Sequence, residues 1–297
     1  MIAADERAVI VVPCFNEEHR IDQGAFLGLA DTEGVRLLFV DDGSTDATGR
    51  ILAAMADASD AIEVFSLETN TGKAEAVRRG LVVALRSGAD VVGYYDADLA
   101  TPPGELVRLI RELRSRPELS GVLASRVARL GSSIERNALR HYVGRTYATI
   151  ASIALGITVY DTQCGAKVFR VNDTFAAALA EPFRSSWAFD AEMLHRLLRG
   201  NTHAPGLPVD SFVELPLTAW HDVSGSKMRF GPALAALFDL LRIARRRRRT
   251  GRSERNSAPV AAAVAMTPQH RLDLRGARGA EQTAPDGETG QKRAQHT

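Results

Sequence analysis

Four short apolar runs alternate with helical patterns in the first hundred residues of this chain. The runs cover residues 8–15, 35–42, 61–68 and 90–98, and the patterns between them cover 23–31, 45–58 and 73–87. The first run is continuously β-branched, as expected of a strand buried on both faces of a sheet. The alternation predicts an α/β fold with a mostly parallel, Rossmann-like central sheet and flanking helices.

A polar cluster stands at or just past the end of each apolar run. The clusters read CFNEE, DDGSTD, ETNTGKAEA and DADLATPP. Ligands of open parallel sheets bind outside the carboxyl ends of the strands, so one cleft could collect all four clusters. Its acids would be Glu17, Asp41, Asp42, Asp96 and Asp98.

The sequence does not match two common phosphate-binding motifs. The first run leads into PCFNEE, which lacks the glycines of a dinucleotide fingerprint. Leu67 and Ala74 stand where a P-loop around NTGKAE needs a glycine and a Ser or Thr. An acidic cleft repels a bare phosphate but attracts it through a divalent cation, which carboxylates and substrate phosphates commonly share. Asp96 and Asp98 therefore predict a Mg²⁺ or Mn²⁺ site that also holds a nucleotide.

The rest of the chain continues with mixed elements. We expect helices at 101–117, 133–157 and about 190–199, and strands at 121–126, 167–171 and 212–220. An amphipathic helix is predicted over 231–249, and the sequence beyond it, rich in Gly, Ala, Pro, Gln and charge, predicts a disordered tail over 250–297.

Charge is distributed unevenly along the chain. The net charge is only +1, yet residues 242–252 contain seven arginines at the end of the 231–249 helix. This basic helix favours peripheral contact with an anionic membrane surface. Nucleic acid and a solvated helix end are the alternative interpretations of the arginine run, and we favour the membrane over nucleic acid.

The sequence predicts no transmembrane span. No stretch reaches the roughly 18 apolar residues that a span needs, and the N-terminal stretch has acidic residues where a signal peptide needs basic ones. Cys14 and Cys164 are too few for a disulfide framework and lack zinc spacing. We expect a cytoplasmic protein that lies peripherally at the cytoplasmic face of the membrane.

Seven stretches resemble the signatures of one enzyme family. VVPCFNEE, FVDDGSTDAT, NTGKAEAVRRG and YYDADLATPP resemble successive motifs of the inverting family-2 glycosyltransferases, which have the GT-A fold. DTQCGAKVFR, SWAFDAEML and WHDVSGSKM resemble the dolichyl-phosphate β-glucosyltransferase branch, close kin of the dolichyl-phosphate mannose synthases. The resemblance covers about residues 6–230 and implies a GT-A domain over 1–230.

The resemblance implies a site for a nucleotide-sugar donor. Its residues would be Pro13, Asn16, Glu17, Asp42, Lys73, Asp96 and Lys227. Asp98 would ligate the metal through the donor diphosphate, and Asp96 would assist the metal or bind the ribose. Ser44 and Thr45 are also good helix N-caps, so DDGSTDAT has a structural interpretation beside the functional one. Lys73 has one too, as a solvated residue in the first turn of its helix.

The resemblance also implies an acceptor site and a catalytic acid. Arg126, Arg136 and Arg140 would bind a lipid phosphate, because arginine forks suit phosphate oxygens; Arg129 belongs to the same cluster, and a solvated face is the alternative. Asp190, with Glu192 beside it, occupies the region of the family's catalytic acids, with a helix cap as the alternative. Further implied site residues are Asp161, Gln163 and Cys164 near the acceptor and Trp220 and Ser226 at the closing loop.

Together these features predict a metal-dependent enzyme that transfers glucose from UDP-glucose to a polyprenyl or dolichyl-type phosphate with inversion. Mannose synthases often place an oxygen donor two residues after the second Asp, where this chain has Ala100, and that departure favours UDP-glucose over GDP-mannose. The alternatives are a GDP-mannose donor, a hydroxyl acceptor in glycolipid or cell-surface polysaccharide synthesis, and a catalytically idle nucleotide-sugar sensor.

Overall fold

The structure is a computed structural model in which residues 6–127, 130, 132–134, 148–153 and 155–221 are described. Several predictions from the sequence lie outside these residues. They concern Arg129, Arg136, Arg140, Ser226, Lys227, the helix at 231–249 and the tail at 250–297.

The described residues form a seven-stranded sheet with the order β3-β2-β1-β4-β7-β5-β8. Its strands are β1 (Ala8–Cys14), β2 (Val35–Asp41), β3 (Ile62–Ser66), β4 (Val91–Tyr95), β5 (Gly121–Ser125), β7 (Ala166–Arg170) and β8 (Phe212–Pro216). All neighbours pair in parallel except β7, which is antiparallel to both β4 and β5. The prediction of a mostly parallel sheet is therefore confirmed.

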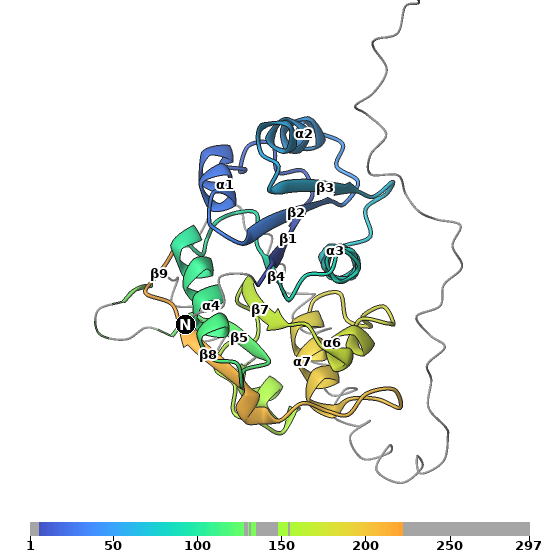
Figure 1. Cartoon of the computed structure of the whole chain (residues 1–297), viewed down its shortest axis with the longest axis vertical. Coiled ribbons are helices and arrows are strands. Elements are labelled where there is room, and N and C mark those ends of the chain that lie inside the picture. The colour runs from blue at the N-terminus through green and yellow to red at the C-terminus, as the bar shows by residue number, and fades with distance from the viewer. Residues whose placement is uncertain (1–5, 128–129, 131, 135–147, 154, 222–297) are drawn as a thin grey trace, which may run out of the picture. The chain divides into compact units, whose positions relative to one another are not determined.

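Helices cover both faces of this sheet (Figure 1). Their bounds are α1 (Gln23–Ala30), α2 (Thr48–Ala58), α3 (Lys73–Arg86), α4 (Pro103–Ser115), α6 (Asp173–Ala178) and α7 (Phe189–Arg199). Side chains alternate between the faces of a strand: Ile10 and Val12 of β1 join a core cluster with α1, α2 and α4, whereas Val9 and Val11 join one with α3, α6 and α7. This two-sided burial explains why the first strands are apolar throughout.

The second half of the described chain departs from the predicted elements. The helix predicted over 133–157 is wrong at both ends. Ser133–Ile134 forms a short strand, β6, paired with β9 (Ala219–Trp220), and the helical residues 148–153 and 155 stop before Gly156, whose φ of 72° is one that glycine adopts without strain. The strand predicted over 212–220 is divided into β8 and β9, and α6, which Asn172 caps, was not predicted.

Among the described residues, no helix combines the length and the apolar character that crossing a membrane would require. This agrees with the expectation from the sequence for that part of the chain.

Candidate active site

The end of β1 is joined to the loop after β2 by hydrogen bonds. Asn16, with a φ of 53°, donates its backbone N–H to Ser44 Oγ at 3.1 Å and accepts from Thr45 N at 2.9 Å. Glu17 N donates to Thr48 Oγ1 at 2.7 Å. The prediction that Ser44 and Thr45 cap a helix is wrong, because α2 begins only at Thr48 and these two residues bind the β1 end instead.

Pro13 lies in β1 although a central strand rarely accommodates proline. The pairing of β1 with β4 ends at Val11, so the missing N–H of Pro13 falls where β4 no longer runs beside β1. Pro13 still pairs in register with Val40 of β2. The proline thus marks the point where the sheet opens beside the polar clusters.

Asp42 organises the next part of the site. Its buried carboxylate accepts hydrogen bonds from Thr71 N at 2.7 Å, Thr71 Oγ1 at 2.8 Å and Gly72 N at 2.8 Å. An ionised carboxylate has about four acceptor positions, so most of its capacity fixes the loop before α3. Gly43 follows with a φ of 68°, and a β-carbon there would lie within 3 Å of the backbone of Thr69. Three of the four predicted clusters are therefore tied together.

The DADLA loop after β4 carries the two predicted metal ligands. Asp96 Oδ1 lies 2.6 Å from Lys73 Nζ at the start of α3, and the two side chains are 30% and 45% exposed. Asp98 Oδ1 accepts from Ala100 N at 3.1 Å, and Leu99 between them has a φ of 52°. A bulky residue in this conformation is strained, and such strain is concentrated at functional sites.

The electrostatics of this loop show crowded negative charge. Burial and then the charge of Asp96 raise the pKa of Asp98, although Lys73 and Arg20 partly offset the increase. Desolvation alone would lower the pKa of Lys73, but Asp96 and then Asp190 outweigh it, so the pKa of Lys73 is raised. Lys73, Asp96, Asp98 and Asp190 thus share one electrostatic environment.

These carboxylates fit a divalent cation that is shared with a substrate. Carboxylate oxygens are typical ligands of Mg²⁺ and Mn²⁺, and the raised pKa of Asp98 shows that a positive charge there would be favourable. Within the described part of the chain, no group of three or more His, Cys, Asp or Glu side chains is arranged to hold a metal. Asp96 and Asp98 would therefore need diphosphate oxygens or water to complete the coordination.

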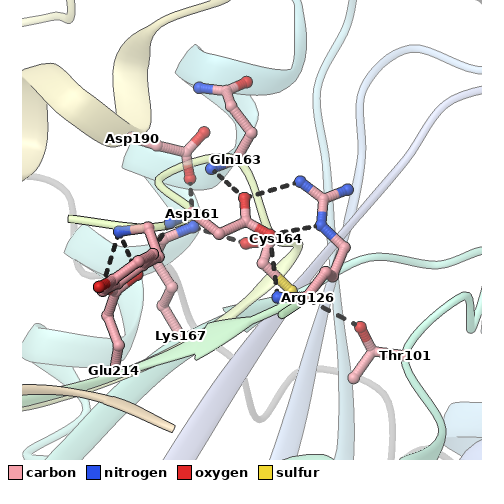
Figure 2. Close-up of polar contacts among 9 residues, drawn as sticks. Thr101, Arg126, Asp161, Gln163, Cys164, Lys167, Asp190 and Glu214 are labelled. Atoms are coloured by element: carbon pink, nitrogen blue, oxygen red, sulfur yellow. Dashed lines mark hydrogen bonds and ion pairs between the residues drawn. The ribbon is translucent and has the colours of Figure 1, made fainter. Parts of the chain in front are cut away.

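Asp190 lies in the first turn of α7 and is 7% exposed. Its Oδ1 accepts hydrogen bonds from the Tyr94 hydroxyl and, at 2.7 Å, from Lys167 Nζ. Figure 2 shows Asp190 with one carboxylate oxygen directed at Lys167. The predicted helix-capping role is not seen, because α7 has no side-chain N-cap.

Arg126, just past β5, is already engaged by an acid (Figure 2). Its Nε and Nη2 donate to Asp161 at 2.6 and 2.8 Å, and its guanidinium lies 5.5 Å from the ring centre of Trp220. Burial alone would lower the pKa of Arg126, but Asp161 holds it well above its ordinary value. Tyr160 N and Asp161 N in turn donate to the carboxylate of Glu214. Arg126 is therefore a cation that Asp161 holds in position.

Cys164 is fully buried, with its sulfur 3.9 Å from Thr101 Oγ1. Burial raises its pKa to about 11, which disfavours a thiolate nucleophile. Cys164 is therefore a small packed residue and not a nucleophile.

Several residues of the site were not predicted. They are Arg20, Tyr94, Gly165 and Lys167. Of these residues, Lys167 was the easiest to predict from the sequence, because a lysine within the apolar strand KVFRV must be paired when it is buried. Gly165 carries no comparable signal, and its role is visible only because a β-carbon there would lie 2.1 Å from Asp96 Oδ2.

Comparisons with known proteins found relatives that are named as sugar-transferring enzymes. The chain is 27% identical over 247 residues to a dolichyl-phosphate beta-glucosyltransferase of Trichomonas vaginalis, which covers 79% of this chain and 69% of that protein. It is 25% identical over 225 residues to a polyprenol monophosphomannose synthase of Mycolicibacterium smegmatis, covering 75% and 83% of the two chains.

A solved structure shows the same fold. Glucosyl-3-phosphoglycerate synthase from Mycobacterium tuberculosis, in complex with Mn²⁺, UDP-glucose and phosphoglyceric acid, matches with a TM-score of 0.59 at 19% identity, covering 81% of this chain and 80% of that one. The expected GT-A architecture is thereby confirmed. The model of glycosyl transferase family 2 matches residues 9–174, which is more than half of the chain. This chain therefore belongs to glycosyl transferase family 2.

Proposed function

We propose that this glycosyltransferase moves glucose from UDP-glucose to the phosphate of a polyprenyl or dolichyl-type lipid, with inversion at the anomeric carbon. One observation carries the proposal: Lys73 Nζ lies 2.6 Å from Asp96 Oδ1, Asp96 and Asp98 both raise the pKa of Lys73, and Asp96 also contributes to the raised pKa of Arg126. Such a site can hold a metal-bound diphosphate on one side and a second phosphate on the other.

The donor half of the site would use the polar clusters at the strand ends. Pro13, Asn16 and Glu17 would line the nucleoside pocket, and Asp42 would shape it through the loop that it holds. Asp96 and Asp98 would hold Mg²⁺ or Mn²⁺, which, when bound, offsets negative charge on the departing diphosphate. Lys73 and Lys227 would contribute positive charge to the same diphosphate.

The transfer itself needs little proton chemistry. An oxygen of the acceptor phosphate attacks the anomeric carbon opposite the leaving UDP, the bond from that carbon to the diphosphate oxygen breaks, and UDP leaves with the bonding electrons. A lipid monophosphate has a second pKa of about 6 and is largely ionised at neutral pH. We therefore assign Asp190 a role in orienting substrate groups, whereas a hydroxyl acceptor would need it as a general base.

The acceptor half would use Arg126 together with Arg136 and Arg140. Asp161 occupies Nε and Nη2 of Arg126, but a guanidinium has five N–H donors, so the remaining donors can serve a phosphate. The helix predicted over 231–249 would hold the enzyme at the cytoplasmic face of a membrane, where a lipid acceptor would be available.

A second candidate keeps the acceptor and changes the donor to GDP-mannose. The similarity to a polyprenol monophosphomannose synthase favours it. Two observations favour glucose. Ala100 provides no side-chain oxygen after the acid pair, and the chain is similar to several dolichyl-phosphate glucosyltransferases.

The test is transfer of radiolabelled sugar from UDP-glucose or GDP-mannose into polyprenyl phosphate in vesicles, with Mg²⁺, Mn²⁺ or EDTA. The proposal expects an organic-soluble, acid-labile product from UDP-glucose, formed only with metal and lost in D98N. If label were transferred from GDP-mannose alone, the donor would be GDP-mannose instead of UDP-glucose. A product formed with hydroxyl lipids but not with lipid phosphate would refute the proposed phosphate acceptor.

A further inference from the structure

Lys167 is a charged residue in the middle of a buried strand. Its side chain is only 1% exposed. Its Nζ donates to Asp190 Oδ1 at 2.7 Å and to Cys164 O at 2.5 Å, and it lies 5.1 Å from the ring centre of Tyr94. A buried ammonium group is tolerated only where it is paired and hydrogen-bonded, so these contacts account for Lys167 being charged in the core.

Tyr94 reaches the same oxygen from the neighbouring strand. Tyr94 of β4 and Lys167 of β7 are register partners, so both side chains leave the sheet toward the first turn of α7. Within the described part of the chain, both side-chain donors to this carboxylate bind Oδ1. The second oxygen of Asp190 is directed away from Lys167 (Figure 2).

The charges around Asp190 place it beside the donor side of the site. Lys73 at the start of α3 is close enough that Asp190 contributes to the raised pKa of that lysine. Among the residues that the structure describes, the titratable groups that interact with Asp190 are Lys167 from β7, Tyr94 from β4 and Lys73 from α3.

We infer that Lys167 and Tyr94 are positioning residues that hold the Asp190 carboxylate in one orientation, with Oδ2 presented as a hydrogen-bond acceptor to a hydroxyl group of the bound substrate. The inference deepens the proposed function and rests on it only for the choice of the transfer assay. The inference predicts that removing Lys167 lowers the rate only when residue 190 still carries a carboxylate.

The test is a double-mutant cycle with K167M, D190N and K167M/D190N. We expect K167M alone to lower kcat by about tenfold or more, as loss of outer-shell partners commonly does. In the D190N background the same substitution should change kcat less than about twofold, since residues acting as a unit are not additive. An equal loss in both backgrounds would show a merely structural Lys167 and overturn the inference.

The split between kcat and KM gives a second readout that a merely structural role would not produce. Because the inference has Lys167 act through the orientation of Asp190 and not through substrate contact, K167M should lower kcat while KM for the nucleotide sugar changes less than about twofold. A KM that rises in proportion to the fall in kcat would contradict the inference. Should K167M fail to fold, Y94F removes only one hydroxyl, and its effect on kcat should likewise vanish in D190N.

R170M is the matched control. Arg170 lies on the same strand and forms its own ion pair with Glu6 at 2.5 Å, so its loss should change stability without lowering kcat. All variants are assayed on whichever nucleotide sugar the wild type consumes, including hydrolysis to free sugar. Failure of polyprenyl phosphate as acceptor would then refute the proposed function and still leave the cycle measurable.

Discussion

Replacing Gly165 by alanine should disable the acid pair without touching an acid. A β-carbon at position 165 would lie 2.1 Å from Asp96 Oδ2 and 2.2 Å from its Cγ, whereas ordinary van der Waals contact begins at 3.4 Å. The carboxylate must therefore move by about 1.3 Å, the difference between 3.4 and 2.1 Å. Backbone movement offers little relief, because Asp96 N donates to Gly165 O at 2.9 Å and holds the two segments together.

The displacement has a predictable catalytic cost. Asp96 pairs with Lys73 at 2.6 Å, and a shift of this size separates the pair and misplaces the proposed metal ligand. A misplacement of about 1 Å can lower a rate by about 100-fold, so we expect G165A to reduce kcat/KM by roughly that factor.

The assay is sugar transfer with saturating Mg²⁺ or Mn²⁺, with G28A as the control. A β-carbon at Gly28, inside α1, meets nothing within 4 Å. G28A should keep full activity and gain about 0.5–1 kcal/mol of stability, as Gly to Ala does in a helix. If G165A kept more than half of the wild-type kcat/KM and its metal affinity, the assigned role of Asp96 would be refuted.

Three further substitutions test the donor half of the site. D98N should abolish transfer in the presence of metal, and in EDTA at pH 7 it should raise the melting temperature. Burial and then Asp96 raise the pKa of Asp98, so stability is lost as the pH rises through that pKa, and the gain in melting temperature of D98N should disappear near the ordinary value of 3.8. K73M should weaken UDP-glucose binding in calorimetry more than it weakens uridine binding, because it removes a charge from the proposed diphosphate site; equal weakening would place Lys73 elsewhere. D42N should lower the free energy of unfolding in urea by about 1–3 kcal/mol, since its amide nitrogen cannot accept a hydrogen bond and would face either Thr71 N or Gly72 N. The control D57N, on the exposed face of α2, should change that free energy by no more than about 0.5 kcal/mol.

The parallel half of the fold could be predicted because its signals are local. Each of β1 to β4 is a short apolar run bounded by polar residues, and the parallel order brings their ends to one edge. The contact of Asp42 with the loop before α3 follows from that order. What the pattern left open was which polar groups bind one another. Ser44 and Thr45 are suitable helix-capping residues, but both bind Asn16 instead. The Ser44 hydroxyl accepts from Asn16 N, and Thr45 N donates to Asn16 Oδ1.

The part of the site around Arg126 and Asp190 could not be predicted in the same way, because it depends on pairing between distant segments. The antiparallel strand β7 lies between β4 and β5, and no periodicity in the sequence specifies that position. The pairs Tyr94–Lys167 and Arg126–Asp161 follow from it, across 73 and 35 residues respectively. The sequence shows that Arg126 is a candidate cation but not that an acid already holds it.

The position of β7 also explains why the stretch DTQCGAKVFR reads as a signature. Within this one segment, Asp161 fixes Arg126 at 2.6 Å and Lys167 fixes Asp190 at 2.7 Å, while Gly165 between them leaves space for the carboxylate of Asp96. Each of these contacts ends on a side chain that we place at the donor or the acceptor. A segment that contacts no substrate in this assignment therefore sets the geometry of both halves, and substitutions in it should affect kcat more than the binding of either substrate.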